Sequence, residues 1–350
     1  MGYPMKFNKI SFAISTALLG AGLMLSTQAL AKGRLVVYCS ATNEMCEAET
    51  QAFGKKYDVK TAFIRNGSGS TFAKVEAEKN NPQADVWYGG TFDPQAQAAE
   101  MGLLEPYQSE HIKEVVERFQ DPAKIKGHYV SAIYMGILGY GVNTERLKKL
   151  GITEVPKCWK DLTDPRLKGE IQIADPQSSG TAYTAIATFV QLWGEQGAFD
   201  YFKQLHPNIS QYTKSGITPS NSAARGEATI GIGFLHDYAV QKQAGAPVEL
   251  IVPCEGTGYE LGGLSIIKGS RNIDNAKLFV DFVLSKEGQE TAWRKGNSHQ
   301  TLTNTTAEQS PTAFDPTKLN LINYDFEKYG DSAERKRLIE KWVQEVKLAK

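Results

Sequence analysis

The stretch "RLVVYCSATNEMCEAETQAFGKKYDVKTAFIR", residues 34–65, places a strand, a helix and a second strand in succession. Residues 34–40 form a short apolar run typical of a buried strand, and the spacing of alanine and phenylalanine in 43–57 favours a helix. Residues 59–65 predict the next strand, and the alternation continues with a helix in 66–81, a strand in 84–90 and a short helix after it. This order indicates an α/β fold with a mostly parallel sheet covered by helices on both faces.

The second half of the chain repeats the alternation. Residues 169–176 predict a strand that runs into "PQSSGTAYTAIATF" (176–189), and strand signals return in 206–213 and 248–267. No linker rich in glycine, serine and proline separates the halves, which favours two α/β lobes joined by crossing strands. Ligands of such sheets bind outside the carboxyl ends of the strands, where the loops 40–43, 66–71 and 89–91 fall.

The first 31 residues read as a secretory signal. Lys6 and Lys9 precede an apolar run at 10–25, and Ala29 and Ala31 occupy the small-residue positions of a cleavage site after Ala31. A retained membrane anchor is the alternative, but the run is short and rich in Ser, Thr and Gly. Acidic and basic residues balance at 39 each, so no charge excess points to nucleic acid. We expect an exported protein.

Four cysteines remain after the signal. An even count in an oxidising compartment favours disulfides, with three possible pairings. The closeness in sequence of Cys39 and Cys46 favours Cys39–Cys46, which leaves Cys158–Cys254. Metal binding by the cysteines is the lesser alternative, because no CxxC pair exists.

The helix that follows Pro176 begins with several hydroxyls. The first N–H groups of a helix have no internal partner and lie at the positive end of its dipole, so they attract an anion. An ordinary cap by Ser178 or Ser179 is the alternative reading. A second hydroxyl-rich helix start occurs in 66–71, and the loop after the first strand carries two more hydroxyls. The predicted phosphate-binding residues are Ser40, Thr42, Gly69, Ser70, Thr71, Ser179, Gly180 and Thr181.

Three further polar residues favour recognition of hydroxyl groups. His236 and Asp237 sit where a strand gives way to a helix, and Glu260 lies near a second strand crossing. Carboxylates and imidazoles form directional bonds to sugar-type hydroxyls, although a structural cap is the alternative for His236 and Asp237. A hydrolase is the rival from another class, but the chain has no GxSxG, HExxH, P-loop or Rossmann glycine pattern. We therefore expect no catalytic residue, no cofactor and no bound metal.

Four segments carry a family resemblance. "LGYGVNTERLKKLG" (138–151), "IADPQSSGTAY" (173–183), "AARGEATIGIGFLHDYA" (223–239) and "GGLSIIKGSRNIDNAKLFVDFVLSKEGQ" (262–289) resemble, in this order, the periplasmic substrate-binding proteins of ABC importers, in the branch of the ferric-ion-binding proteins. The resemblance implies the type II fold, two lobes each with a mixed, mostly parallel sheet flanked by helices and a ligand in the hinge cleft. It also implies a monomer that delivers its solute to a membrane permease with an ATPase. The expected lobes are 32–130 plus 262–315 and 131–261, with the helices of 316–350 packing on both.

The ligand class follows from where the chain departs from the ferric-binding pattern. That pattern has a histidine after the first strand, a glutamate after the third and a Tyr-Tyr pair, whereas this chain has Ser40–Asn43, Gly89–Thr91 and Leu235-His236. Ferric iron needs several anionic oxygen ligands, which these residues do not supply. The chain is most similar to members that take up sugar phosphates, above all hexose 6-phosphates. Ferric ion and other organophosphates or phosphonates are the alternatives.

Overall fold

The computed structural model describes residues 1–2, 33–124 and 128–348. The predicted signal peptide, with its cleavage site after Ala31, lies outside the described residues except for its first two positions. None of the described helices is both long and apolar enough to cross a membrane. The fold below is that of the unit Ala31–Lys350.

The first part of this unit is a parallel βαβ arrangement, as the alternation predicted. β1 (Arg34–Cys39) pairs in parallel with both β2 (Lys60–Arg65) and β3 (Val86–Thr91). The helices α1 (Asn43–Tyr57), α2 (Ser68–Ala77) and α3 (Phe92–Glu100) follow these strands. Because the three strands are parallel, their carboxyl ends and the loops after them meet at one edge.

One long strand joins the two halves of the sheet. β5 (Ser131–Asn143) is buried throughout. Its first residues pair antiparallel with β10 (Tyr259–Ile267), and its last residues pair antiparallel with β8 (Ile230–Phe234) and β9 (Val248–Ile251). The main strand order is β2-β1-β3-β10-β5-β8-β6-β7. We call β2-β1-β3-β10 the N-terminal half of the sheet and β8-β6-β7 with β9 the C-terminal half.

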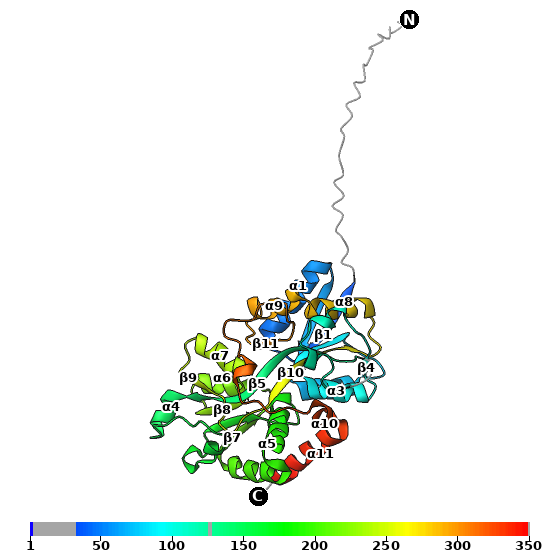
Figure 1. The fold of residues 1–350 in the computed structure, drawn as a ribbon. Coiled ribbons are helices and arrows are strands. Elements are labelled where there is room, and N and C mark those ends of the chain that lie inside the picture. Colours follow the sequence, from blue (N-terminus) through cyan, green and yellow to red (C-terminus); the bar gives the residue numbers. More distant parts are fainter. Residues whose placement is uncertain (3–32, 125–127, 349–350) are drawn as a thin grey trace. The chain divides into compact units, whose positions relative to one another are not determined.

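The C-terminal half is also of α/β type (Figure 1). β6 (Ile171–Ala174) pairs in parallel with β7 (Ile209–Thr213) and β8, and α5 (Gly180–Leu205), α6 (Thr218–Ala224) and α7 (Leu235–Gln243) connect the strands. The other helices and strands are β4 (Leu104–Glu105), α4 (Thr144–Lys149), α8 (Ile273–Leu284), α9 (Lys286–Arg294), β11 (Thr301–Leu302), α10 (Phe326–Gly330) and α11 (Ser332–Trp342). The predicted mixed α/β fold of type II is confirmed.

The end of the described chain packs on both halves. Tyr183 OH in α5 donates to the carbonyl of Tyr329 at 2.7 Å, and Arg335 Nη1 donates to Gln97 Oε1 in α3 at 3.1 Å. Trp342 is buried against Tyr212 of β7. The lobe boundaries given above stay a prediction.

Both predicted disulfides are present. Cys39 bonds to Cys46, which ties the end of β1 to α1, and Cys158 bonds to Cys254 across 96 residues of sequence. The lesser alternative, metal binding by these cysteines, is therefore wrong.

Candidate functional site

A polar cavity lies where the carboxyl ends of strands from both halves of the sheet meet. The empty space inside it, including the open solvent at its mouth, is about 460 Å³. Its lining is Ser40, Ala41, Thr42, Arg65, Gly67, Ser68, Gly90, Thr91, Tyr134, Ser179, Gly180, Thr181, Gly216, Ile217, Phe234, His236, Asp237, Glu260 and Gln300. Eight of the eleven residues predicted from the sequence are in this set, and Gly69, Ser70 and Thr71 are not.

The start of α5 opens into this cavity. Ser179 is the N-cap residue, but its side chain makes no capping hydrogen bond, and Ser178 Oγ instead donates to the carbonyl of Lys214 at 2.9 Å. The alternative that these serines serve as side-chain caps is therefore wrong. α5 is interrupted by a kink at Gly194, and the positive end of its first helical part lies at the cavity, with the hydroxyls of Ser179 and Thr181 beside it.

The second helix start contributes different residues from those predicted. α2 begins at Ser68 with Gly67 as its N-cap, and these two residues line the cavity. Ser70 is exposed, Gly69 lies against the backbone of 177–178, and the Thr71 side chain is buried beneath Ser40. The lining therefore draws on Gly67 and Ser68 of this helix start, and a phosphate-binding role for Gly69, Ser70 and Thr71 stays a prediction.

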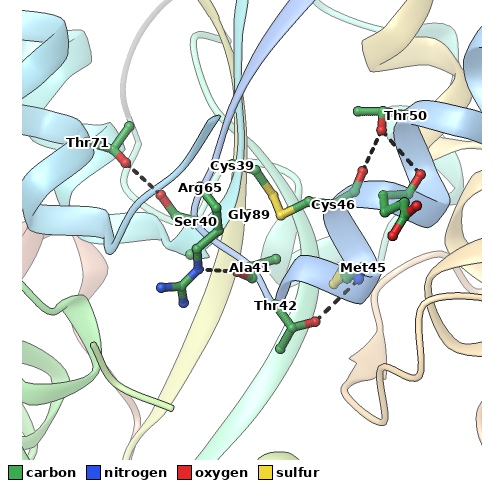
Figure 2. The surroundings of a disulfide bond; sticks show 12 residues. Cys39, Ser40, Ala41, Thr42, Met45, Cys46, Thr50, Arg65, Thr71 and Gly89 are labelled. Carbon is green, nitrogen blue, oxygen red and sulfur yellow. Dashed lines mark hydrogen bonds between the residues drawn. A yellow bond between two sulfur atoms is a disulfide. The ribbon is translucent and has the colours of Figure 1, made fainter. Parts of the chain in front are cut away.

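The loop after β1 presents two hydroxyls that were predicted (Figure 2). Thr42 caps α1, with its Oγ1 accepting from Met45 N at 3.3 Å, and an acceptor bond of this kind leaves the hydroxyl proton free. Ser40 Oγ accepts from Trp87 Nε1 at 3.0 Å. Gly89, at a φ of 73°, lies so close to Ala41 that a Cβ there would stand 2.9 Å from the Ala41 methyl group.

Arg65 is a cavity residue that the sequence reasoning missed. It is the last residue of β2 and the only lysine or arginine in the lining. Its Nε donates to the carbonyl of Ala41 and its Nη1 to Ser215 Oγ, both at 3.0 Å, so it links loops from both halves of the sheet. Burial lowers the pKa of Arg65, and the charge of Asp237 opposes that shift. The sequence did contain a signal for Arg65, because it is a charged residue at the carboxyl end of a predicted parallel strand, directly before a glycine-rich loop.

The three residues predicted for hydroxyl recognition all line the cavity. α7 has Phe234 as its N-cap residue and no side-chain cap, so the capping alternative for His236 and Asp237 is wrong. Gly136 of β5 makes room for them, because a Cβ there would meet Glu260 Oε1 at 2.7 Å and His236 Cε1 at 2.8 Å. Glu260 and His236 therefore come close together only because β5, β10 and α7, which are distant in the sequence, are packed together in the fold.

Burial sets the protonation of this group. Burial, and then the charge of His299, lower the pKa of His236 to about 3, so its imidazole is neutral at pH 7. Burial raises the pKa of Asp237 to about 7, against the opposing effect of Arg65. Burial, and then the charge of Asp237, raise the pKa of Glu260 well above its ordinary value. At neutral pH this side of the cavity therefore carries less negative charge than its composition suggests.

Two buried polar atoms of the lining have no hydrogen-bond partner among the described residues. They are Thr91 Oγ1 and His236 Nδ1. Leaving such a group unpaired typically costs about 1–3 kcal/mol. Tyr134, by contrast, is held by the backbone, since its OH accepts from Gly90 N at 2.8 Å. Such atoms are unusual, because most buried polar groups in folded proteins are hydrogen-bonded.

The cavity does not gather metal ligands. Among the described residues, the one cluster of three His, Cys, Asp or Glu side chains close enough to hold an ion is Cys158, Cys254 and Glu255, and its two sulfurs form a disulfide. His236, Asp237 and Glu260 do not form such a cluster.

Comparison with known proteins places this architecture in a family. Residues 81–328 match the family of bacterial extracellular solute-binding proteins. The chain is 77% identical, with a TM-score of 0.90, to the periplasmic binding protein AfuA from Actinobacillus pleuropneumoniae, solved with exogenous fructose 6-phosphate bound; the match covers 91% of this chain and all of that one. It is 51% identical, with a TM-score of 0.87, to the periplasmic binding protein P5PA, over 90% of this chain and all of that one.

Comparison of sequences finds further relatives. A Haemophilus influenzae protein of uncharacterized function is 81% identical over 99% of this chain and 100% of its own. More distant relatives are a putative 2-aminoethylphosphonate-binding periplasmic protein of Salmonella typhimurium, 24% identical over 79% of this chain and 82% of its own length, and the major ferric iron-binding protein of Neisseria meningitidis, 26% identical over 79% and 83%.

The chain belongs to the bacterial extracellular solute-binding protein family. It is a periplasmic solute-binding protein of the ABC-transporter type, in the branch that includes the ferric-binding proteins, with a small-molecule ligand and a permease as its partner. The similar proteins AfuA and P5PA are both described as periplasmic binding proteins.

Proposed function

We propose that this protein captures sugar phosphates, above all hexose 6-phosphates, and delivers them to its permease without changing them chemically. The observation that carries the proposal is the polarity of the cavity. The lining combines a cation, Arg65, and the open starts of α2 and α5 with the polar side chains of His236, Asp237 and Glu260. A solute that carries both a phosphate and hydroxyl groups matches this combination.

The charges of the lining residues favour a phosphate ester over inorganic phosphate as the ligand. Arg65 and the helix starts favour a dianion. The two acids disfavour a second anionic group, whereas neutral hydroxyls can both donate to and accept from them. The neutral imidazole of His236 adds a donor or acceptor for the same hydroxyls. The bound fructose 6-phosphate of the 77% identical AfuA supports this ligand class.

The other parts of the proposal concern the protein's setting. We propose that the signal in residues 1–31 is cleaved after Ala31, that the mature protein is a monomer in the periplasm, and that an ATPase drives the permease. We further propose lobes of 32–130 plus 262–315 and of 131–261, closing on the ligand about β5 and β10. The contact between Arg65 and Ser215 supports closure, because it joins loops of the two halves beside the cavity.

Isothermal titration calorimetry with four solutes tests the function. We expect tight 1:1 binding of fructose 6-phosphate or glucose 6-phosphate and little heat from free fructose. Binding of ferric ion or of 2-aminoethylphosphonate in place of both hexose phosphates would contradict the proposal and support the corresponding alternative. A turnover assay on the same solution should return the hexose phosphate unchanged.

Alanine variants test the two sides of the cavity. His236→Ala, Asp237→Ala and Glu260→Ala should each weaken hexose 6-phosphate binding by about 1–3 kcal/mol, the usual cost of an unpaired buried polar group. The two acid-to-alanine changes should leave inorganic phosphate binding intact, because the acids are assigned to the sugar hydroxyls, and they should strengthen it to the extent that the removed acid was ionised. Intact sugar-phosphate affinity in all three variants would refute this assignment.

A further inference from the structure

The hydroxyl of Ser40 lies in the cavity wall and has two hydrogen-bond partners behind it. Trp87 Nε1 is 3.0 Å from Ser40 Oγ and can only donate. Thr71 Oγ1 is also 3.0 Å from Ser40 Oγ, and either hydroxyl of that pair can be the donor (Figure 2). Because a serine hydroxyl has two lone pairs and one proton, the direction of the Thr71 bond decides where the Ser40 proton points.

The two directions differ in what they leave unpaired. If Ser40 donates to Thr71, the Thr71 proton has no acceptor among the described residues, although this side chain is fully buried. If Thr71 donates to Ser40, both lone pairs of Ser40 are used, and its one proton is left for an acceptor in the cavity. Only the second arrangement pairs every hydroxyl once an acceptor is bound.

The position of Ser40 is held firmly. Its backbone N–H donates to the carbonyl of Tyr88 at 2.9 Å, and the preceding residue, Cys39, is tied to α1 by its disulfide. On the other side, Arg65 Nε donates to the carbonyl of Ala41 at 3.0 Å, as Figure 2 shows. The hydroxyl of Ser40 therefore meets the cavity at a defined point, and its rotation is set by Thr71 and Trp87.

We propose that Thr71 is a positioning residue, which together with Trp87 directs the Ser40 proton at an anionic oxygen of the ligand. The inference rests on the proposed function, because an anion in the cavity completes the chain from Thr71 to Ser40 to phosphate oxygen. Hydrogen bonds in such a chain polarise one another, which makes Ser40 a stronger donor than an isolated serine. Thr71 thus serves the phosphate side without touching the ligand.

A double-mutant cycle tests this assignment with fructose 6-phosphate and inorganic phosphate as probes. Thr71→Val keeps the shape but removes the donor, and should weaken both phosphates about 5- to 10-fold, the usual effect of one lost hydrogen bond. Thr71→Ser restores the hydroxyl and should restore affinity. In a Ser40→Ala background, Thr71→Val should change affinity less than about 2-fold, because the effect acts through Ser40.

A second readout does not depend on these variants. The indole N–H resonance of Trp87, assigned by its loss in Trp87→Phe, should shift when inorganic phosphate binds, because Ser40 becomes more polarised. Unchanged or tighter phosphate binding by Thr71→Val would overturn the assignment. It would mean that, in the wild-type protein, Ser40 donates to Thr71 and not to the ligand. An undiminished Thr71→Val effect in the Ser40→Ala background would also overturn the assignment. A wild-type protein that binds no phosphate at all would overturn the proposed function as well.

Discussion

Replacing Arg65 removes the one cationic side chain of the cavity lining. An arginine has five N–H donors, and two of them are occupied by the carbonyl of Ala41 and the hydroxyl of Ser215. The remaining donors can bind a phosphate in a bidentate manner. Hydrogen bonds to charged groups are worth about 1.5–3 kcal/mol each, so the loss of two should weaken fructose 6-phosphate binding by Arg65→Met by at least about 3 kcal/mol, or roughly 150-fold.

Two comparison variants separate charge from geometry. Arg65→Lys keeps the charge but loses the planar fork, so we expect an intermediate loss of about 1–2 kcal/mol. Arg225→Met is the matched control, because Arg225 is exposed and pairs with Glu227 outside the cavity. Calorimetry at one ionic strength measures all three variants. If Arg65→Met bound fructose 6-phosphate as tightly as Arg225→Met did, the assignment of Arg65 to the phosphate would be refuted.

Three further outcomes follow from the structure. Burial raises the pKa of Asp237 from 3.8 to about 7, so the folded protein binds this proton more tightly than the unfolded chain does. The stability of the ligand-free protein should therefore fall as the pH rises between these two values. Thermal melts across this pH range should show a flatter slope for Asp237→Asn. The Cys158–Cys254 disulfide spans 96 residues, and replacing both cysteines by serine should cost about 4–5 kcal/mol in urea unfolding, whereas a cost below 1 kcal/mol would contradict the chain-entropy argument. A Cβ on Gly180 would collide with the Thr91 side chain, so Gly180→Ala should reduce the compaction that fructose 6-phosphate produces in small-angle scattering.

Local patterns in the sequence predicted much of the fold. Apolar runs alternating with helical spacing located β1, β2 and β3 and the helices between them, because strand and helix periodicities differ. Because ligands bind outside the carboxyl ends of parallel strands, the same patterns also predicted that Ser40, Thr42 and the start of α5 lie at the binding edge of the sheet. The disulfide pairing followed from proximity in sequence and an even count.

The rest of the site depends on information that no local pattern carries. The sequence placed the start of α2 only within "NGSGST", which offers several residues that could begin a helix, and the close approach of Gly67 and Gly69 to the backbone of 177–178 could not be foreseen from it. Arg65 and Gln300 lie 235 residues apart in the numbering, yet both line the cavity. The pairing of the halves through β5 and β10 brings them together, and long-range strand pairing cannot be read from a single window.

Mass spectrometry of the solute carried by the natively exported protein tests the central claim most directly. Protein purified from the periplasm without denaturation is desalted, unfolded in acid, and the released small molecules are identified by mass and fragmentation. The account predicts a hexose 6-phosphate or a closely related sugar phosphate at up to one per protein, and its loss from Arg65→Met. Stoichiometric iron, an aminoalkylphosphonate or a sugar without phosphate would contradict it.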